Sequence, residues 1–185
     1  MCNALDTCVC IGFTFYPDKH YPPANNFIST TQQKLYWTTN VRTEYTRKYS
    51  KINRSITYFS GTVIEILRKK DGRYFDSYYD FEKLILNNTR HINLDNHKKI
   101  RIIEYLWNKI NNVIDFKVIR TILTNALGTF NKRQVLLTGK LNYHHCDSKI
   151  HKQYGHIGQK FIGNGGHPND DIVVVEAHHL GLTET

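Results

Sequence analysis

Apolar and polar side chains alternate in several segments of the chain, and this alternation predicts β-strands. Apolar residues stand at every second position of residues 8–16, and residues 56–67 repeat the pattern with many β-branched and aromatic side chains. A period of two is typical of a strand with one buried face. We expect further strands in five segments, at residues 35–41, 73–79, 116–123, 134–141 and 172–178.

Turn and helix signals separate these segments. Asp71-Gly72 lies between two of them and favours a hairpin, because Gly accepts the positive φ of a tight turn. The clearest predicted helix begins after Asp95, a suitable N-cap, and a shorter one begins near Asp80. In the helix after Asp95, apolar residues recur at spacings of three and four: Ile100, Ile103, Leu106, Trp107, Ile110 and Ile114. Residues 20–34 and 143–170 are expected to be loops.

These elements predict an α+β fold, with a mainly antiparallel β-sheet or sandwich and a few packed helices. A length of 185 residues suits a single domain, residues 1–185. No apolar run approaches the roughly 18 residues that a membrane-spanning helix needs. The first residues carry an acid and lack the basic region of a signal peptide. We therefore expect no membrane partner.

The chain is strongly basic and has few cysteines. The formal net charge is +9, and such a charge attracts polyanions, so nucleic acid or a bound nucleotide is a natural ligand. Three of the four cysteines stand in the first ten residues, which does not form a disulfide framework. We expect a reducing compartment, the cytoplasm.

The last third of the chain is rich in potential zinc ligands. Imidazole and thiolate groups bind zinc, and they are provided there by His144, His145, Cys146, His151, His156, His167, His178 and His179. Cys8 and Cys10 could join them if their strand lay nearby. However, no C-x-x-C pair or H-E-x-x-H helix is present. The sequence therefore predicts no metal site and requires no cofactor.

The same segment offers one catalytic alternative. His145, His156 and Lys160 have the chemistry of a metal-independent ribonuclease, with two imidazoles for acid and base catalysis and a cation for the phosphate. This alternative describes a small basic endoribonuclease or RNA-binding domain that uses the His-rich loop 144–160. The glycines nearby do not complete a P-loop, because Asn164 follows Gly163 where that motif requires Lys.

Tyrosine is unusually frequent, with 12 residues. A tyrosine ring combines a large rigid apolar surface with a polar tip, which suits contacts between protein molecules. Tyrosines beside basic residues, as at Arg73-Tyr74, could instead stack on bases. The composition favours contact surfaces, and the candidates are Tyr74, Tyr78 and Tyr79. No residue set spells out an enzyme, so we expect a protein without catalysis.

Three short segments resemble the cypovirus polyhedrins, which crystallise inside infected insect cells and encase virions. These are the Asp- and Tyr-rich residues 75–82, the Val-Ile-Arg-Thr-Ile stretch at residues 118–122, and the His-Lys-Gln-Tyr-Gly stretch at residues 151–155. The long amino-terminal helix that links trimers in that family has no counterpart before Cys8.

The resemblance implies an antiparallel sandwich, trimers in a dense intracellular crystal, and bound nucleotides. It would make the chain its own main partner, with virions as the cargo, in the cytoplasm of an infected host cell. Tyr and Lys titrate near pH 10, so charge changes there would dissolve such a crystal in alkali. We expect self-assembly that is lost above about pH 10.

Overall fold

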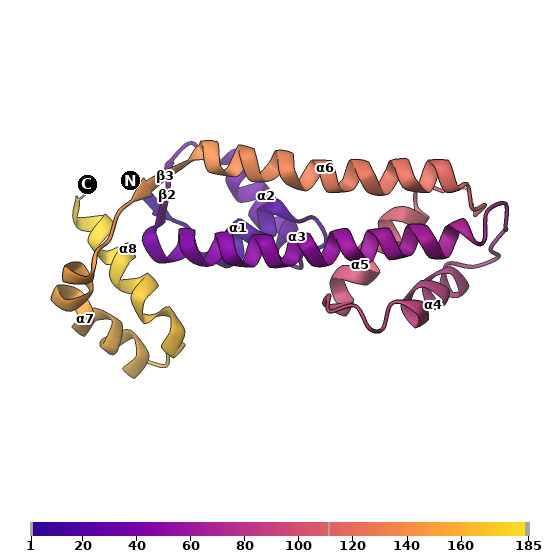
Figure 1. The fold of residues 1–185 in the computed structure, drawn as a ribbon. Helices are drawn as coiled ribbons and strands as arrows, with labels where there is room; N and C mark the ends of the chain where they lie inside the picture. The colour runs from indigo at the N-terminus through magenta and orange to yellow at the C-terminus, as the bar shows by residue number, and fades with distance from the viewer. Residues whose placement is uncertain (1, 111, 184–185) are drawn as a thin grey trace.

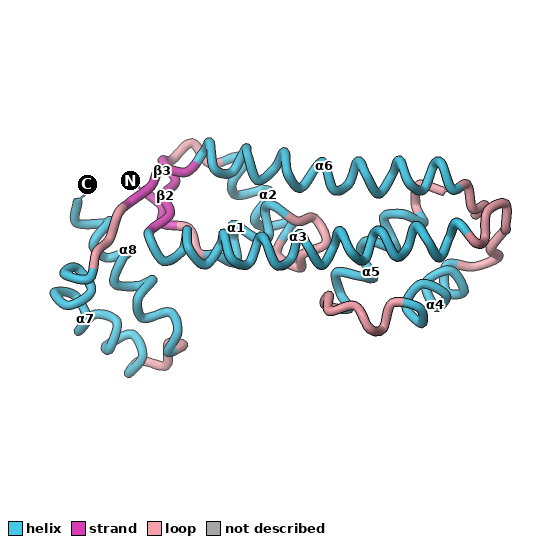
Figure 2. The backbone as a smooth tube through the Cα atoms, viewed as in Figure 1, coloured by secondary structure: helices cyan, strands magenta, loops and turns pink. Residues whose placement is uncertain are grey.

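Helices form most of the protein, and two long ones set its shape (Figures 1 and 2). Helix α3 (Thr39–Arg68) and helix α6 (Phe116–Lys140) lie side by side along the length of the molecule. The short helix α1 (Thr7–Thr14) packs against both of them. Helix α2 (Tyr21–Thr30) packs on α1 and accepts hydrogen bonds from Arg133 and Lys140 of α6. The computed structural model describes residues 2–110 and 112–183.

Two further helix pairs cover opposite ends of this body. Helices α4 (Tyr78–Asn88) and α5 (Asn96–Trp107) pack on each other at the end where α3 finishes. At the other end, α7 (Ser148–Gly163) and α8 (Asp171–Thr183) form a hairpin, joined through the 3-10 turn Pro168–Asp170. Both pairs extend to the same side of α3 in Figure 1.

A small parallel sheet joins three distant parts of the chain. Its strands are β1 (Cys2–Ala4), β2 (Lys34–Thr38) and β3 (Leu141–His144), with β2 in the middle. Thr38 pairs with His144 at the carboxyl ends of β2 and β3. Helix α3 starts directly after β2, and α6 ends directly before β3, so the sheet fixes the start of one long helix beside the end of the other.

The core is rich in aromatic side chains, and several tyrosines belong to it. Phe130 of α6 lies 5.2 Å from Phe15, measured between ring centroids, and 5.3 Å from Tyr16. Tyr45 is 2% exposed, and its hydroxyl lies 2.9 Å from that of Thr14. Part of the high tyrosine content is therefore explained by packing inside one molecule.

The expected antiparallel α+β fold is wrong. Within the described residues, the sheet is parallel and has three short strands, and the segments 8–16, 56–67, 116–123, 134–141 and 172–178 lie mainly in helices. The reason is visible in α3, whose buried residues Ile56, Phe59, Val63 and Leu67 follow the helical spacings of three, four and four. In α1, the five consecutive residues 10–14 are all buried, so alternation between apolar and polar positions carries no information there.

Capping signals were more reliable than alternation. The helix after Asp95 is confirmed as α5, and the carboxylate of Asp95 accepts hydrogen bonds from the first turn. The helix expected near Asp80 is confirmed as α4, with Ser77 as its N-cap. Gly72 has a φ of 75°, as a tight turn requires, but this turn follows α3 instead of joining two strands. The expected loop 143–170 contains α7.

No helix in residues 2–110 and 112–183 combines the length and the apolar character needed to cross a bilayer.

We expect Asp115→Ala to lower the free energy of unfolding by about 1 kcal/mol, because the Asp115 carboxylate accepts hydrogen bonds from Lys117 N and Val118 N at the start of α6. Urea denaturation followed by circular dichroism measures this change. Asp76→Ala is the matched control, since Asp76 is exposed and precedes α4 without capping it. An equal loss in both variants would contradict the capping role.

Candidate metal centre

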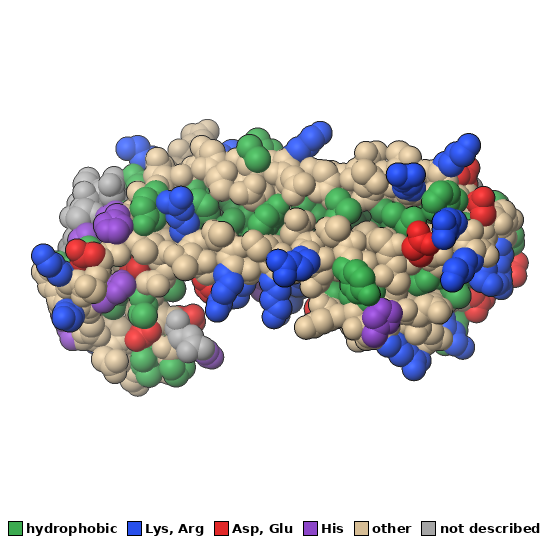
Figure 3. Space-filling view, viewed as in Figure 1, with side chains coloured by type: hydrophobic (Ala, Val, Ile, Leu, Met, Phe, Trp, Pro, Cys, Tyr) green, Lys and Arg blue, Asp and Glu red, His purple; other side chains and the backbone are tan. Residues whose placement is uncertain are grey.

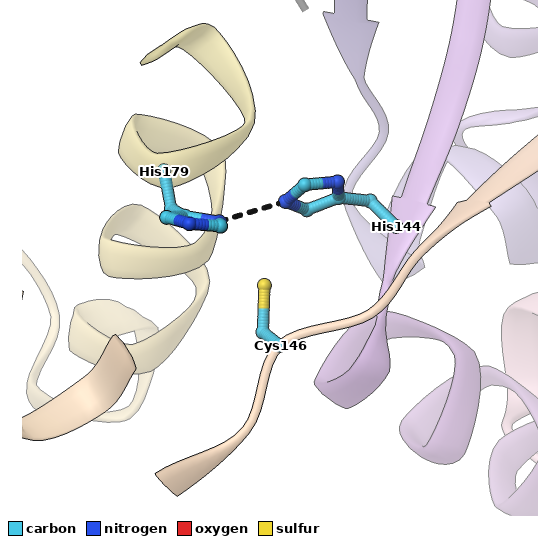
Figure 4. A group of neighbouring side chains, drawn as sticks. All are labelled: His144, Cys146 and His179. Atoms are coloured by element: carbon cyan, nitrogen blue, oxygen red, sulfur yellow. Dashed lines mark hydrogen bonds between the residues drawn. The ribbon is translucent and has the colours of Figure 1, made fainter. Parts of the chain in front are cut away.

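Three potential metal ligands converge where the C-terminal hairpin meets the sheet (Figure 4). His144 is the last residue of β3, Cys146 follows it by two positions, and His179 comes from α8. One ligand atom from each, the imidazole nitrogens and Cys146 Sγ, lies within 4.8 Å of the other two. The chain therefore brings two imidazoles and one thiol to a single point.

The short segment between β3 and α7 is fixed at both ends. His144 pairs with Thr38 in the sheet, and Cys146 N donates a 2.8 Å hydrogen bond to Thr39 Oγ1. Asp147 then caps α7, because its carboxylate accepts hydrogen bonds from two backbone N–H groups of the first turn. Cys146 is consequently held in place by its neighbours and is 3% exposed.

Helix α8 supplies the third ligand and holds a buried acid beside it. Glu176 lies one turn before His179 and is fully buried. Its carboxylate accepts hydrogen bonds from Asn40 Nδ2 at 2.7 Å and Asn40 N at 3.2 Å, and lies 3.0 Å from His151 Nε2. These contacts join α8 to α3 and α7, and so set the position of His179.

Helices α7 and α8 also approach each other closely at Gly158 of α7. This residue is buried, and an added Cβ would lie 3.0 Å from Asp171 O of α8.

The Cys146 thiol is protonated at neutral pH in this environment. Burial raises the pKa of Cys146 to about 12, and the negative charges of Glu176 and Asp147 act in the same direction. A reactive cysteine nucleophile needs surroundings that stabilise its thiolate. These surroundings do the opposite, so the group does not resemble a cysteine–histidine catalytic pair.

The three groups suit zinc in both type and spacing. His144 Nε2 lies 2.9 Å from His179 Nδ1 in a hydrogen bond. Zinc bonds of about 2.0–2.1 Å to nitrogen would place two imidazole nitrogens of a tetrahedral site about 3.3 Å apart. A small separation of the rings would therefore admit the ion. Three protein ligands leave the fourth tetrahedral position for water or another donor.

The sequence included these three residues in a larger His and Cys set but predicted no metal site. The structure separates part of the set, because Cys8 is exposed on α1 and Cys10 is buried there. His178 and His179 both pack against Tyr154, and of these two His179 joins the group. The useful signal was the His-x-Cys spacing of His144 and Cys146, which places two ligands on one side of an extended segment. His179 joins them only through the tertiary fold.

The alternative catalytic residues occupy less enclosed positions. His145 is exposed, and its Nδ1 lies 3.3 Å from the Tyr143 hydroxyl. His156 and Lys160 are exposed on α7, four residues apart and so on one face of the helix. The predicted flexible loop around them is therefore mostly helical, and their role in RNA cleavage stays a prediction.

The tyrosines selected for self-assembly lie around the start of α4. Tyr74 is 56% exposed and Tyr79 is 65% exposed, so both rings are accessible for contacts with other molecules. Tyr78 is half-buried and packs edge-on against Trp107, and burial raises its pKa. Two of the three candidates thus lie on the surface.

No known protein family, curated protein or solved structure matches this chain. Its function must therefore be inferred from its own geometry.

Proposed function

We propose that the chain is a zinc-binding protein in which the metal fastens the C-terminal helical hairpin α7–α8 to the body. The observation that supports this is the convergence of His144, Cys146 and His179 within 4.8 Å. Two of the ligands belong to the end of β3, and the third belongs to α8. One ion bound to all three would link the sheet directly to the last helix.

The metal would add a link where the α7–α8 hairpin has few contacts with the body. The hairpin touches the body mainly through α8, where Val175 and Leu180 are buried and Glu176 bonds to Asn40. Binding of a structural metal contributes directly to folding free energy. A ligand present at about 100 times its Kd adds about 2.7 kcal/mol of stability. We further place the protein in the cytoplasm, where reducing conditions keep Cys146 free to bind.

We expect the metal-free protein to bind one equivalent of Zn²⁺, and Co²⁺ in the same position. Titration calorimetry gives the stoichiometry, and a sulfur-to-cobalt charge-transfer absorption reports the thiolate ligand. Cys146→Ser should abolish that absorption, and His179→Gln should weaken Zn²⁺ binding by at least roughly tenfold, because each removes one of three ligands.

His145→Gln is the matched control. His145 stands between two of the ligands in the sequence, but it is exposed and contacts Tyr143 instead. The Zn²⁺ affinity of the His145→Gln variant should equal that of the unaltered protein. Binding that persists in Cys146→Ser and His179→Gln, or that falls equally in His145→Gln, would refute the proposed centre.

Self-assembly into an alkali-soluble occlusion body stays a prediction. The exposed rings of Tyr74 and Tyr79 are compatible with it, but the sandwich fold implied by the polyhedrin resemblance is not the fold of this chain. Imaging of cells that express the protein would test it, since it requires micron-scale crystals or large particles.

A further inference from the structure

A stripe of cations runs along the exposed face of α3. Arg47, Lys51 and Arg54 follow one another at spacings of four and three residues, and all three are exposed. This spacing places them on one side of the helix. Tyr58 continues the row four residues later and is 57% exposed. We call these four residues the α3 stripe.

The charge of this stripe is only partly offset by its own helix, where the Glu44 carboxylate interacts with Arg47. Between residues 39 and 64 the single acid is Glu44, which forms a 2.7 Å ion pair with Lys48. Figure 3 shows Lys and Arg side chains along the middle of α3, at the edge of a hollow between the C-terminal hairpin and the α4–α5 end. Lys and Arg side chains of α3 therefore border a recess instead of a flat surface.

A groove continues the stripe toward the sheet. It is lined by hydroxyl, guanidinium and phenol groups, those of Thr39, Arg42, Thr43, Thr46, Arg47, Ser50 and Tyr143. The guanidinium of Arg42 lies 4.7 Å from the centroid of the Tyr143 ring, which is 44% exposed. An accessible ring thus stands near each end of the row of cations.

We propose that this surface, the α3 stripe with Arg42 and Tyr143, binds single-stranded nucleic acid. Cations that follow a backbone and rings that stack on bases are the two components of sequence-tolerant single-strand binding. From Arg42 to Tyr58 the helix rises about 24 Å. That length suits a short strand, within the roughly 4–16 nucleotides bound by small single-strand-binding domains.

The recess favours a flexible strand over stiffer polyanions. A single strand can bend into a hollow, turn its unpaired bases toward Tyr58, and continue into the groove that Tyr143 lines. A duplex keeps its bases stacked internally, and a membrane surface would meet the projecting helix pairs before α3. This inference is independent of zinc binding, because it uses other residues.

The test is fluorescence anisotropy with labelled oligouridine and oligothymidine strands of about 12 nucleotides. In the variant Arg47→Gln/Lys51→Gln/Arg54→Gln, we expect affinity to fall at least roughly tenfold at low salt. Between roughly 50 and 200 mM salt, the slope of log affinity against log salt should fall by about 2, since each lost phosphate contact to a single strand removes about 0.7. Tyr58→Leu should weaken binding by roughly tenfold with an unchanged slope.

The matched control removes the same charge elsewhere. Lys69→Gln/Lys117→Gln/Lys132→Gln takes three exposed cations from the end of α3 and from α6. This control variant should keep most of the affinity of the unaltered protein for the labelled strands. Tighter binding of either oligouridine or oligothymidine supports the proposal and identifies RNA or DNA as the ligand. Equal losses in both triple variants, tighter binding of a duplex of the same length, or no binding to the unaltered protein would overturn it.

Discussion

Phe130→Ala is expected to lower the free energy of unfolding by about 3–5 kcal/mol, the usual cost of removing a buried phenyl ring. Phe130 is 1% exposed, and its ring contacts Phe15 and Tyr16, so its loss opens a cavity between α6 and the segment that follows α1. Small domains are stable by only about 5–15 kcal/mol. Urea denaturation at neutral pH measures the difference.

Two variants define the cause of that loss. Phe130→Leu retains most of the volume and should cost less than about 1.5 kcal/mol. Leu136→Ala truncates a side chain on the same helix that is 57% exposed, so its effect should stay near 0.5 kcal/mol. If Leu136→Ala were as destabilising as Phe130→Ala, the contact between α6 and this aromatic group would not be the core of the fold.

The protein is expected to lose stability steeply above about pH 10. Burial raises the pKa of Tyr16 and of Tyr45 well above the usual tyrosine value, whereas both titrate near pH 10 when unfolded. Below pH 10 both phenols are protonated in the folded and in the unfolded protein, so their titration removes no stability. Above it the unfolded state releases protons first, so each tyrosine removes up to about 1.4 kcal/mol per pH unit until its folded pKa is reached. Circular dichroism and phenolate absorbance would follow the unfolding.

Tyr16→Phe separates this effect from self-assembly. No hydrogen-bond partner for the Tyr16 hydroxyl occurs among the described residues, so its removal should cost little at pH 7. The variant should lose stability less steeply above pH 10. Tyr79→Phe removes a hydroxyl from a ring that is 65% exposed and should behave like the unaltered protein. An unchanged slope in Tyr16→Phe would rule out the burial of this phenol as the cause.

The sequence predicted the elements that carry strong local signals. Asp95 caps α5 and is followed by apolar residues at helical spacing, so the start of the helix could be inferred. The buried face was predicted only in part, because Ile103 and Leu106 are buried in α5 but the helix ends at Trp107, before Ile110 and Ile114. Alternation misled in α1 because five consecutive residues, 10–14, are buried in this short helix. It misled in residues 116–123 and 134–141 because each window covers only part of α6. Periods of two and 3.6 are hard to separate over so few residues.

Of the sheet, β2 was anticipated by the strand expected at residues 35–41, but the parallel pairing was not. The three strands carry little local information. Each has three to five residues, and their pairing depends on segments far apart in the chain. The candidate metal ligands were visible as residue types, and His144 and Cys146 as a close pair in the sequence. The choice of His179 over its neighbour His178 depends on the orientation of α8, which the α7–α8 contact and the bonds of Glu176 determine.

The register of the sheet also fixes an order of events during synthesis. Leu35 of β2 pairs with Leu141 of β3, so β2 emerges from the ribosome with one neighbour long before the other exists. One edge of β2 therefore stays unpaired while α3 to α6 are made, and late pairing between distant segments is intrinsically slow. His144, Cys146 and His179 come together only after that closure, which makes assembly of this group one of the last steps of folding.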